Sequence, residues 1–334
     1  MKTLYVGIDV SKLTLDVALT IDGKKTLVMK KLTNNSAGFK VLEEWTRKRS
    51  EKDECHKIHF LIEATGIYSD SLAEYLYSRE DLKVTVINPA QVKSFGKSIL
   101  LRTKTDKIDA ELLASYAAMI RPEATVKTPD EIKKLKSIVR ELQFQIDLRA
   151  KIKTRLESAI DLEIAELIEQ DIQYYNEKVK NLEKRIRDHI KNHKLLKEKI
   201  DLLRTIQGIG ERSAQLILCE FHNEDGTGKI SAKAQTAHAG LAPQQKLSGI
   251  SVNGKPKICK TGNKRLRKGL YLPALTAIRQ NQVIKEFYER LLKNGKKKMV
   301  ALVAAMRKLL VIAIGVLNNK TPFDPNWKNS VQFA

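Results

Sequence analysis

The stretch LYVGIDVSKLTLDVAL, residues 4–19, predicts two apolar strands joined by a short polar turn. The segment KTLVMKKL (25–32) follows after a second short turn and has the same strand character. Asp9 lies inside the first of these strands. A charge in that position is costly when buried, unless it is paired or binds a cation. Residues 4–32 therefore predict a sheet that carries a carboxylate at a position where packing would favour an apolar residue.

Alternating strands and helices follow these first three strands. Ser36 is expected to cap a helix over 37–49, because apolar residues recur there at helical spacing. A helix is also expected to begin near Asp106. Further segments are IHFLIE (58–63) and KVTVINP (83–89) as strands, with SDSLAEYLYSR (69–79) as a helix between them. The order β-β-β-α-β-α-β-α predicts an α/β RNase H-like (RuvC-like) domain over residues 1–125, with a mixed sheet that carries carboxylates at strand ends.

A long charged helical region comes next, and it lacks proline and glycine from residue 130 to residue 203. Its second half repeats apolar residues at alternating steps of three and four, at Ile172, Tyr175, Val179, Leu182 and Ile186. The pattern predicts a coiled-coil linker over 126–203 that dimerises. Two antiparallel helices that turn within 160–172, or a seam shared between subunits, are both compatible with it.

The last region, 204–325, is expected to be mainly α-helical. LLRTIQGIGERSAQLIL (202–218) resembles a helix-hairpin-helix turn, in which the backbone near Gly208 and Gly210 holds a phosphate. A plain turn between two helices fits the spacing nearly as well. The apolar stretch 299–317 carries Arg307 and Lys308 at its centre, which favours a buried helix over a membrane span.

The charge of the chain is strongly asymmetric. The whole chain has a net charge of +22, and residues 206–334 alone hold 22 Lys and Arg against 7 Asp and Glu, a net +15. A lysine-rich composition would explain the total but not the asymmetry, so the excess predicts a nucleic-acid partner. Three cysteines at unrelated spacings and the absence of a leader segment predict a cytoplasmic protein without disulfides.

Four acids are candidates for chemistry: Asp9, Glu63, Asp106 and Asp109. Each has an ordinary explanation by itself. Asp9 could be a turn former at the end of a strand, Glu63 the partner of a lysine, and the two aspartates of the helix its N-cap and a favourable charge for its dipole. Asp106 and Asp109 lie three residues apart, which places them on one helix face. Four acids at the expected ends of one fold repel each other, and a pair of Mg²⁺ ions is the usual remedy. The set predicts a metal-dependent nuclease, with Lys104 and Lys107 near the phosphate.

The segments GIDVSKLTLDVAL, IEATGIYSDSLAEYL, VINPAQVKSFGKS and LRTKTDKIDAELLA resemble, in order, the blocks of the DEDD transposases of the insertion-sequence one-ten family, with their DNA-invertase relatives. Later segments, TIQGIGERSAQLIL, HAGLAPQQKLSG and ICKTGNKRLRKGLYLPAL, resemble the C-terminal transposase domain of that family. The resemblance implies that the four acids bind Mg²⁺, for which Mn²⁺ can substitute. It also implies a serine nucleophile at Ser248, with Ser251 as the rival. The family often has two serines before the glycine, whereas this chain has Leu247-Ser248-Gly249.

The same resemblance implies DNA as substrate, a guide noncoding RNA and a homo-oligomer, either a dimer or a tetramer. The expected function is strand exchange that mobilises an insertion sequence. A structure-selective RuvC-like endonuclease, an invertase without a guide, and a non-catalytic nucleic-acid-binding protein are the alternatives. Phosphate contacts are expected from one basic segment, although a solvated helix face would have the same composition; its residues are Lys260, Asn263, Arg265, Arg267 and Lys268.

Overall fold

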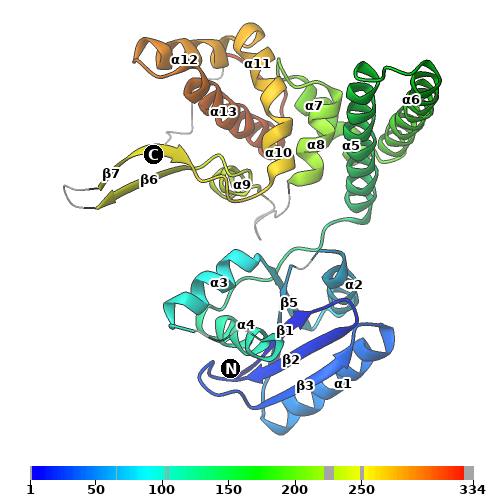
Figure 1. The fold of residues 1–334 in the computed structure, drawn as a ribbon. Coiled ribbons are helices and arrows are strands. Elements are labelled where there is room, and N and C mark those ends of the chain that lie inside the picture. Colours follow the sequence, from blue (N-terminus) through cyan, green and yellow to red (C-terminus); the bar gives the residue numbers. More distant parts are fainter. Residues whose placement is uncertain are drawn as a thin grey trace. The chain divides into compact units, whose positions relative to one another are not determined.

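The computed structural model of the chain describes residues 2–64, 66–101, 103, 105–221, 229–248 and 252–326 (Figure 1). The chain divides into two compact units, residues 1–127 and 128–334. Each unit has its own hydrophobic core.

The first unit is built on a five-stranded mixed sheet with the strand order β3-β2-β1-β4-β5. β1 pairs antiparallel with β2, and β2 with β3, whereas β1–β4 and β4–β5 are parallel pairs. The strands are β1 (Thr3–Val10), β2 (Thr14–Thr20), β3 (Val28–Thr33), β4 (Lys57–Glu63) and β5 (Leu82–Ile87). This mixed sheet with helices is consistent with the expected RNase H-like domain.

Helices cover both faces of the sheet. On one face, α1 (Ser36–Lys52) and α2 (Ile67–Tyr77) pack through Phe39, Leu42, Leu72 and Leu76 against the even-numbered residues of β1. On the other face lie α3 (Pro89–Ser98) and α4 (Asp106–Ile120). Strands buried on both faces need nearly continuous apolar sequence, and β1 and β2 have it.

Two details of the expected order were wrong. α3 was missed, because the NP of the VINP segment was taken as the end of a strand. Pro89 is the first residue of this helix, where a missing N–H costs nothing, and the Asn88 side chain accepts a hydrogen bond from the Ala90 N–H at 2.9 Å. The cap of α1 is Asn35 rather than Ser36; the Asn35 side chain accepts from the Gly38 N–H at 2.9 Å.

The second unit begins with a helical hairpin. The Arg149 side chain contacts the Asn176 side chain at 2.8 Å, and His189 contacts the Glu131 carbonyl at 2.8 Å, so α5 and α6 run antiparallel. The turn between them lies at residues 158–161, at the early edge of the expected range. The hairpin helices are α5 (Asp130–Glu157) and α6 (Leu162–Lys191). The contacts between these two helices lie within one chain.

The rest of this unit is helical apart from one β-hairpin. Its helices are α7 (Lys194–Arg204), α8 (Glu211–Glu220), α9 (Ala232–His238), α10 (Lys264–Gly269), α11 (Tyr271–Gln280), α12 (Gln282–Lys293) and α13 (Lys298–Asn319). Buried residues of α5 and α6 belong to the same core as those of α7, α8, α11 and α13. The hydrophobic core therefore runs continuously from the helical hairpin into the C-terminal helices.

A β-hairpin, β6 (Pro243–Ser248) with β7 (Val252–Ile258), interrupts this helical region (Figure 1). It was not expected, because its alternation is hidden by glycine, lysine and glutamine. α13 is long and apolar enough to cross a membrane by length and composition. However, 56% of its most apolar window is buried within the unit, around residues such as Leu309, Leu310 and Ala313, as expected of a core helix.

Candidate functional site

Asp9 and Glu63 lie at the same end of two neighbouring parallel strands. The last residues paired between β1 and β4 are Ile8 and Ile62, and each is followed by one of the two acids. Gly7 faces α4 so closely that a Cβ atom on it would overlap the backbone of that helix. Because side chains alternate along a strand, Asp9 projects to this same face.

Glu63 shares that face. Leu61 pairs with Gly7 across the sheet and packs with Leu112 and Leu113 of α4. Two residues farther along β4, Glu63 must project the same way. The sheet register thus sends both acids toward the helix that carries the other two.

Asp106 and Asp109 lie in the first turn of α4. The N-cap of this helix is Thr105, whose hydroxyl accepts a hydrogen bond from the Ile108 N–H at 3.3 Å. The ordinary explanation of Asp106 as the N-cap is therefore wrong. Both aspartates still gain from the helix dipole, but neither is the cap that begins the helix.

The electrostatics show that the four acids come together. The pKa of Asp9 rises from 3.8 to about 6; partial burial is the largest cause, and the charges of Asp109, Glu63, Asp106 and Asp16 each raise it further. An ionised carboxylate in this position is repelled by its neighbours and poorly solvated. The end of the sheet near α4 is therefore a place where negative charge is concentrated at an energetic cost.

Carboxylate oxygens of this kind suit a hard divalent cation such as Mg²⁺. In the part of the chain that the structure describes, no three His, Cys, Asp or Glu side chains are arranged to hold one metal ion. The donor chemistry of the four acids and their placement at one end of the sheet and the start of α4 fit a divalent cation. Of the two lysines expected nearby, Lys107 is exposed on α4, and Lys104 lies outside the described residues.

A fifth acid near this site was missed. Asp16 of β2 is only 4% exposed and lies directly opposite Asp9 in the antiparallel ladder. Asp16 forms an ion pair with Lys31 of β3 at 3.3 Å. The signal was present in LTLDVAL, where an acid interrupts an apolar strand just as Asp9 does.

Ser248 is the last residue of β6, and it pairs with Val252 at the end of the ladder. Its side chain and the whole of Ser251 lie outside the described residues. Ser248 belongs to the second unit, whereas the four acids belong to the first.

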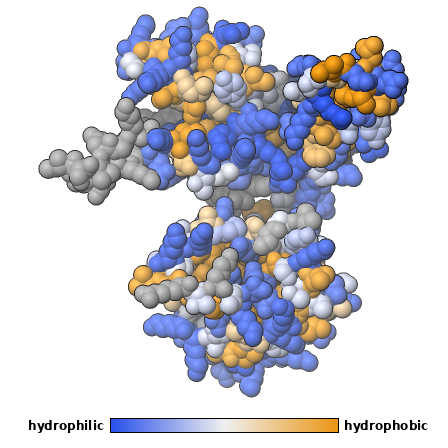
Figure 2. All heavy atoms as spheres, viewed as in Figure 1, coloured by the Kyte–Doolittle hydropathy of each residue, from blue (hydrophilic) through white to orange (hydrophobic). Residues whose placement is uncertain are grey.

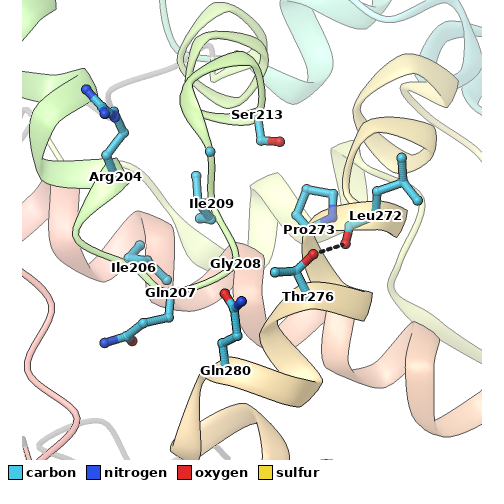
Figure 3. A pocket seen from close by; sticks show the side chains of 11 residues that line it. Arg204, Ile206, Gln207, Gly208, Ile209, Ser213, Leu272, Pro273, Thr276 and Gln280 are labelled. Atoms are coloured by element: carbon cyan, nitrogen blue, oxygen red, sulfur yellow. Dashed lines mark hydrogen bonds between the residues drawn. The ribbon is translucent and has the colours of Figure 1, made fainter.

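The GIG turn between α7 and α8 borders a cavity of about 430 Å³ (Figure 3). The cavity lies between this turn and α11, and its lining includes Arg204, Gln207, Ser213, Thr276 and Gln280. These side chains supply donors together with the first N–H groups of α8, which has no side-chain cap. The lining also includes apolar residues such as Ile206 and Leu272, and Arg204 is the one charged side chain among the described residues that line it, so the donors at the α8 end are the feature that suits an anion.

The two glycines of that turn have different roles. Gly208 has a φ of +103°, and a Cβ atom there would lie 2.6 Å from the Ala277 Cβ and 2.8 Å from the Pro273 carbonyl oxygen. Gly208 therefore allows the turn to pack against α11. Gly210 has an ordinary φ of −84° and open space beside it. Packing therefore requires a glycine at position 208 but not at position 210, where the backbone is exposed.

The five residues of the basic segment also divide into two kinds. Asn263 caps α10 and donates to the buried Glu220 side chain at 2.6 Å. Arg267 donates to the carbonyls of Ala239 and Lys260 at 3.0 and 3.2 Å. These two side chains hold the protein together where a nucleic-acid contact was expected.

The other three basic-segment residues reach solvent. Lys268 is exposed and forms an ion pair with Asp147 at 3.3 Å. Lys260 and Arg265 are also exposed. Arg265 is the second residue of α10, in its first turn, and is well placed to meet a polyanion.

Comparisons with known proteins cover nearly the whole chain. A DEDD transposase model of the IS110 group matches residues 6–164, and the model of the IS116/IS110/IS902 transposase family matches residues 200–289. The pilin gene-inverting proteins of Moraxella bovis and Moraxella lacunata are each 32% identical over 97% of this chain and 98% of their own length. An uncharacterized 43.6 kDa protein of the insertion element IS110 of Streptomyces coelicolor is 27% identical over 40% of this chain and 32% of its own.

The two family models thus match residues in both units, the first from residue 6 to residue 164 and the second from residue 200 to residue 289. The matched regions contain Asp9, Glu63, Asp106, Asp109 and Ser248. The chain belongs to the IS110 family of transposases, the group of DNA recombinases that its carboxylate-bearing sheet and basic helical unit suggest.

Proposed function

We propose that this protein cuts and rejoins DNA strands to move or invert a DNA segment. The observation that carries the proposal is the gathering of four carboxylates near one end of the sheet, where burial and the charges of the neighbouring acids together raise the pKa of Asp9 to about 6. Such a cluster weakens the protein unless cations relieve it. A site that cleaves phosphodiesters with the help of divalent cations would supply those cations.

In this proposal Asp9, Glu63, Asp106 and Asp109 hold divalent cations, Mg²⁺ by preference and Mn²⁺ as a substitute. When bound, the two ions would polarise the phosphate and stabilise the leaving oxygen. Asp106 and Asp109 reach the site from a helix that Gly7 lets approach the sheet closely. Lys104 and Lys107 would then meet the phosphate backbone of the substrate.

Ser248 is the proposed nucleophile, with Ser251 as the rival. The serine hydroxyl loses its proton as its oxygen attacks phosphorus, and a new O–P bond forms. The bond between phosphorus and the leaving sugar oxygen breaks, and that oxygen takes up a proton. Reversal with a different sugar hydroxyl rejoins the strand without an external energy source. The end of a strand is a suitable place for such a serine, since segments presented by a rigid scaffold often hold reactive groups.

The second unit would bind the nucleic acid, in keeping with its high positive charge. Contacts are proposed at Gly210 beside the cavity and at the exposed Lys260 and Arg265. Such phosphate contacts fix position without reading sequence. Target choice would then come from a guide noncoding RNA, which the family resemblance suggests, and the work would take place in the cytoplasm.

Assembly into a homo-oligomer is proposed at the free end of the α5–α6 hairpin. Ile160 is 99% exposed and Leu162 82% exposed. Figure 2 shows apolar residues gathered on the end of this hairpin. Exposed apolar patches often mark interfaces. Light scattering of the wild type and of the Leu162→Glu variant should show a larger assembly that the substitution weakens.

The decisive experiment combines the purified protein with plasmids that carry the native flanking DNA. With Mg²⁺ we expect rejoined recombinants and a protein–DNA adduct that Ser248→Ala abolishes. Full recombination by Ser248→Ala would reject the covalent step, and recombination that Ser251→Ala abolishes would transfer the role. Hydrolysed ends that never religate would indicate an endonuclease. Salt-sensitive binding without any cleavage would indicate a non-catalytic protein.

A second candidate is DNA inversion without transposition. The observation that favours it is the 32% identity, over almost the full length, to proteins named for inverting a pilin gene. Paired recombination sites in inverted and in direct orientation separate the two functions. An invertase acts on the inverted pair in the same molecule, whereas a transposase also integrates into a separate target. Sequencing RNA that copurifies with the protein tests the guide: a single discrete species supports it, and a heterogeneous mixture rejects it.

A further inference from the structure

Three side chains cross the first three strands in one row on the α4 face of the sheet. Asp9 of β1 pairs with Asp16 of β2, which in turn pairs with Lys31 of β3. The next row on the same face, with Ala18 and Met29, packs against α4. Residues directly opposite in a ladder have Cβ atoms about 4.5–5.5 Å apart. Each member of the row is therefore in electrostatic contact with the next.

This row is an unfavourable arrangement for a protein that needs only stability. Like charges opposite each other weaken a sheet, and Asp16 is almost fully buried. Lys31 partly compensates at 3.3 Å, but its own side chain is 56% exposed. Ordinary sheet packing would place an apolar residue at position 16. The row thus retains a buried carboxylate, paired with a half-exposed lysine, beside the carboxylate cluster.

We propose that Asp16 and Lys31 are positioning residues of the carboxylate site, which set the charge that Asp9 and its neighbours present to a divalent cation. The proposal rests on the function proposed above. Asp16 adds negative charge behind Asp9 and so strengthens cation binding. Lys31 offsets that charge and holds Asp16 in place, which keeps the site from binding a cation so tightly that it fails to exchange.

The two residues should act on cation affinity with opposite signs. Asp16→Asn removes a negative charge near the cation and should weaken Mn²⁺ and Mg²⁺ binding about three- to tenfold, the size expected for a charge several ångströms away in a well-screened site. Lys31→Met removes a positive charge and should tighten binding by a similar factor. Lys31→Arg keeps the charge and should stay close to the wild type.

Lys30 offers a matched control on the same strand, β3. It precedes Lys31, so its side chain points to the opposite face of the sheet, where it lies 5.5 Å from the Trp45 ring centre. Lys30→Met makes the same chemical change one residue away. It should leave cation affinity unchanged, which separates a local effect from loss of overall positive charge.

The experiment measures Mn²⁺ binding to the full-length protein by calorimetry without DNA, and the apparent Mg²⁺ requirement for cleavage in parallel. Asp9→Asn serves as the reference for a lost site. If the wild type binds no more Mn²⁺ than Asp9→Asn, the proposed carboxylate function fails. If the wild type binds and Asp16→Asn and Lys31→Met both match it, or shift the same way, the positioning inference alone is overturned. Unfolding temperatures without metal show which variants fold.

Discussion

The two units treat charge in opposite ways. In the first unit, Asp9 is partly buried and lies near other acids, and burial together with the repulsion from those acids raises its pKa to about 6. In the second unit, several polar residues of the basic segment are engaged by oppositely charged or accepting groups. Asn263 holds Glu220, Arg267 holds two carbonyls, and Lys268 pairs with Asp147. We interpret a charged group that lowers stability, such as Asp9, as functional. We interpret a group that its own chain binds well, such as Arg267, as structural.

This contrast has a physical basis. A protein gains stability when a cationic side chain finds acceptors inside its own fold, and such contacts persist without any ligand. A carboxylate cluster loses stability in the absence of a cation, and only a functional benefit retains it. The comparison can therefore be tested by asking which substitutions stabilise the protein and which destabilise it.

The largest expected effect is the loss of strand cleavage when an acid of the cluster is replaced. Asp9→Asn and Asp106→Asn should each lower strand cleavage about a thousandfold or more, since each removes a ligand and a charge from the proposed site. Asp9→Asn should also raise the unfolding temperature without metal, because a repelled, partly buried charge disappears. Plasmid cleavage and thermal unfolding measure the two effects.

Asp81→Asn is the control for that result. Asp81 forms an ion pair with Arg47 at 2.5 Å on the surface of the same unit, away from the cluster of acids. Its substitution should leave cleavage intact and lower stability by no more than about 1 kcal/mol. A cleavage defect as large as that of Asp9→Asn would mean that the assay reports folding.

Much of the first unit followed from sequence because its signals are local. Apolar strands ending in an acid, such as IHFLIE, give both the element and its reactive end. The position of Asp16 relative to Asp9 does not follow from the local pattern. It depends on the register in which β1 and β2 pair. α3 was missed because a proline can end one element and begin another, and the Asn88 cap decides between them.

The second unit was harder to predict for a related reason. A lysine or arginine in a glycine-rich segment has the same appearance whether it meets DNA or a carbonyl of its own chain. The carbonyl partners of Arg267 become neighbours only after folding. The β6–β7 hairpin lacks apolar alternation, so nothing local indicated it. The different roles of Gly208 and Gly210 likewise depend on α11, about 65 residues away in the chain.

The two glycines provide the next largest effect. Gly208→Ala should destabilise the second unit by about 1–3 kcal/mol, because the new methyl group meets α11 and the positive φ disfavours alanine. Gly210→Ala should fold normally and weaken nucleic-acid binding, since its Cβ would occupy open space beside the cavity. Denaturant unfolding and DNA binding of both variants measure this. Equal DNA affinity of Gly210→Ala and the wild type would leave the turn a plain connection between helices.

A smaller effect concerns pH. Since the pKa of Asp9 is raised in the folded protein, the folded state binds more protons than the unfolded state between about pH 4 and about pH 6. The contribution of this group to stability is therefore present at low pH and is lost as pH rises through about 6. We expect a loss of about 1 kcal/mol after solvent screening.

The measurement is the difference in unfolding free energy between the wild type and Asp9→Asn across pH 4–8. The difference isolates Asp9 from carboxylates such as Asp81, whose pKa is lowered by Arg47 and whose contribution has the opposite sign. Adding Mg²⁺ should restore stability at pH 7.5 and have little effect at pH 4.5, where Asp9 is protonated. A pH-independent difference would mean that Asp9 is not strained by its neighbours.

The smallest effect is expected at Arg265, whose side chain is exposed in the second unit. Arg265→Ala should leave stability unchanged, weaken DNA binding severalfold, and reduce the slope of log affinity against log salt by about one. Arg265→Lys keeps a point charge and should recover most of the binding if the contact is to a phosphate. A loss confined to one DNA sequence would instead assign Arg265 to base recognition, because a phosphate contact weakens all sequences alike. In either case the exposed Arg265 would contribute to binding, whereas its neighbours Asn263 and Arg267 are engaged by groups of their own chain.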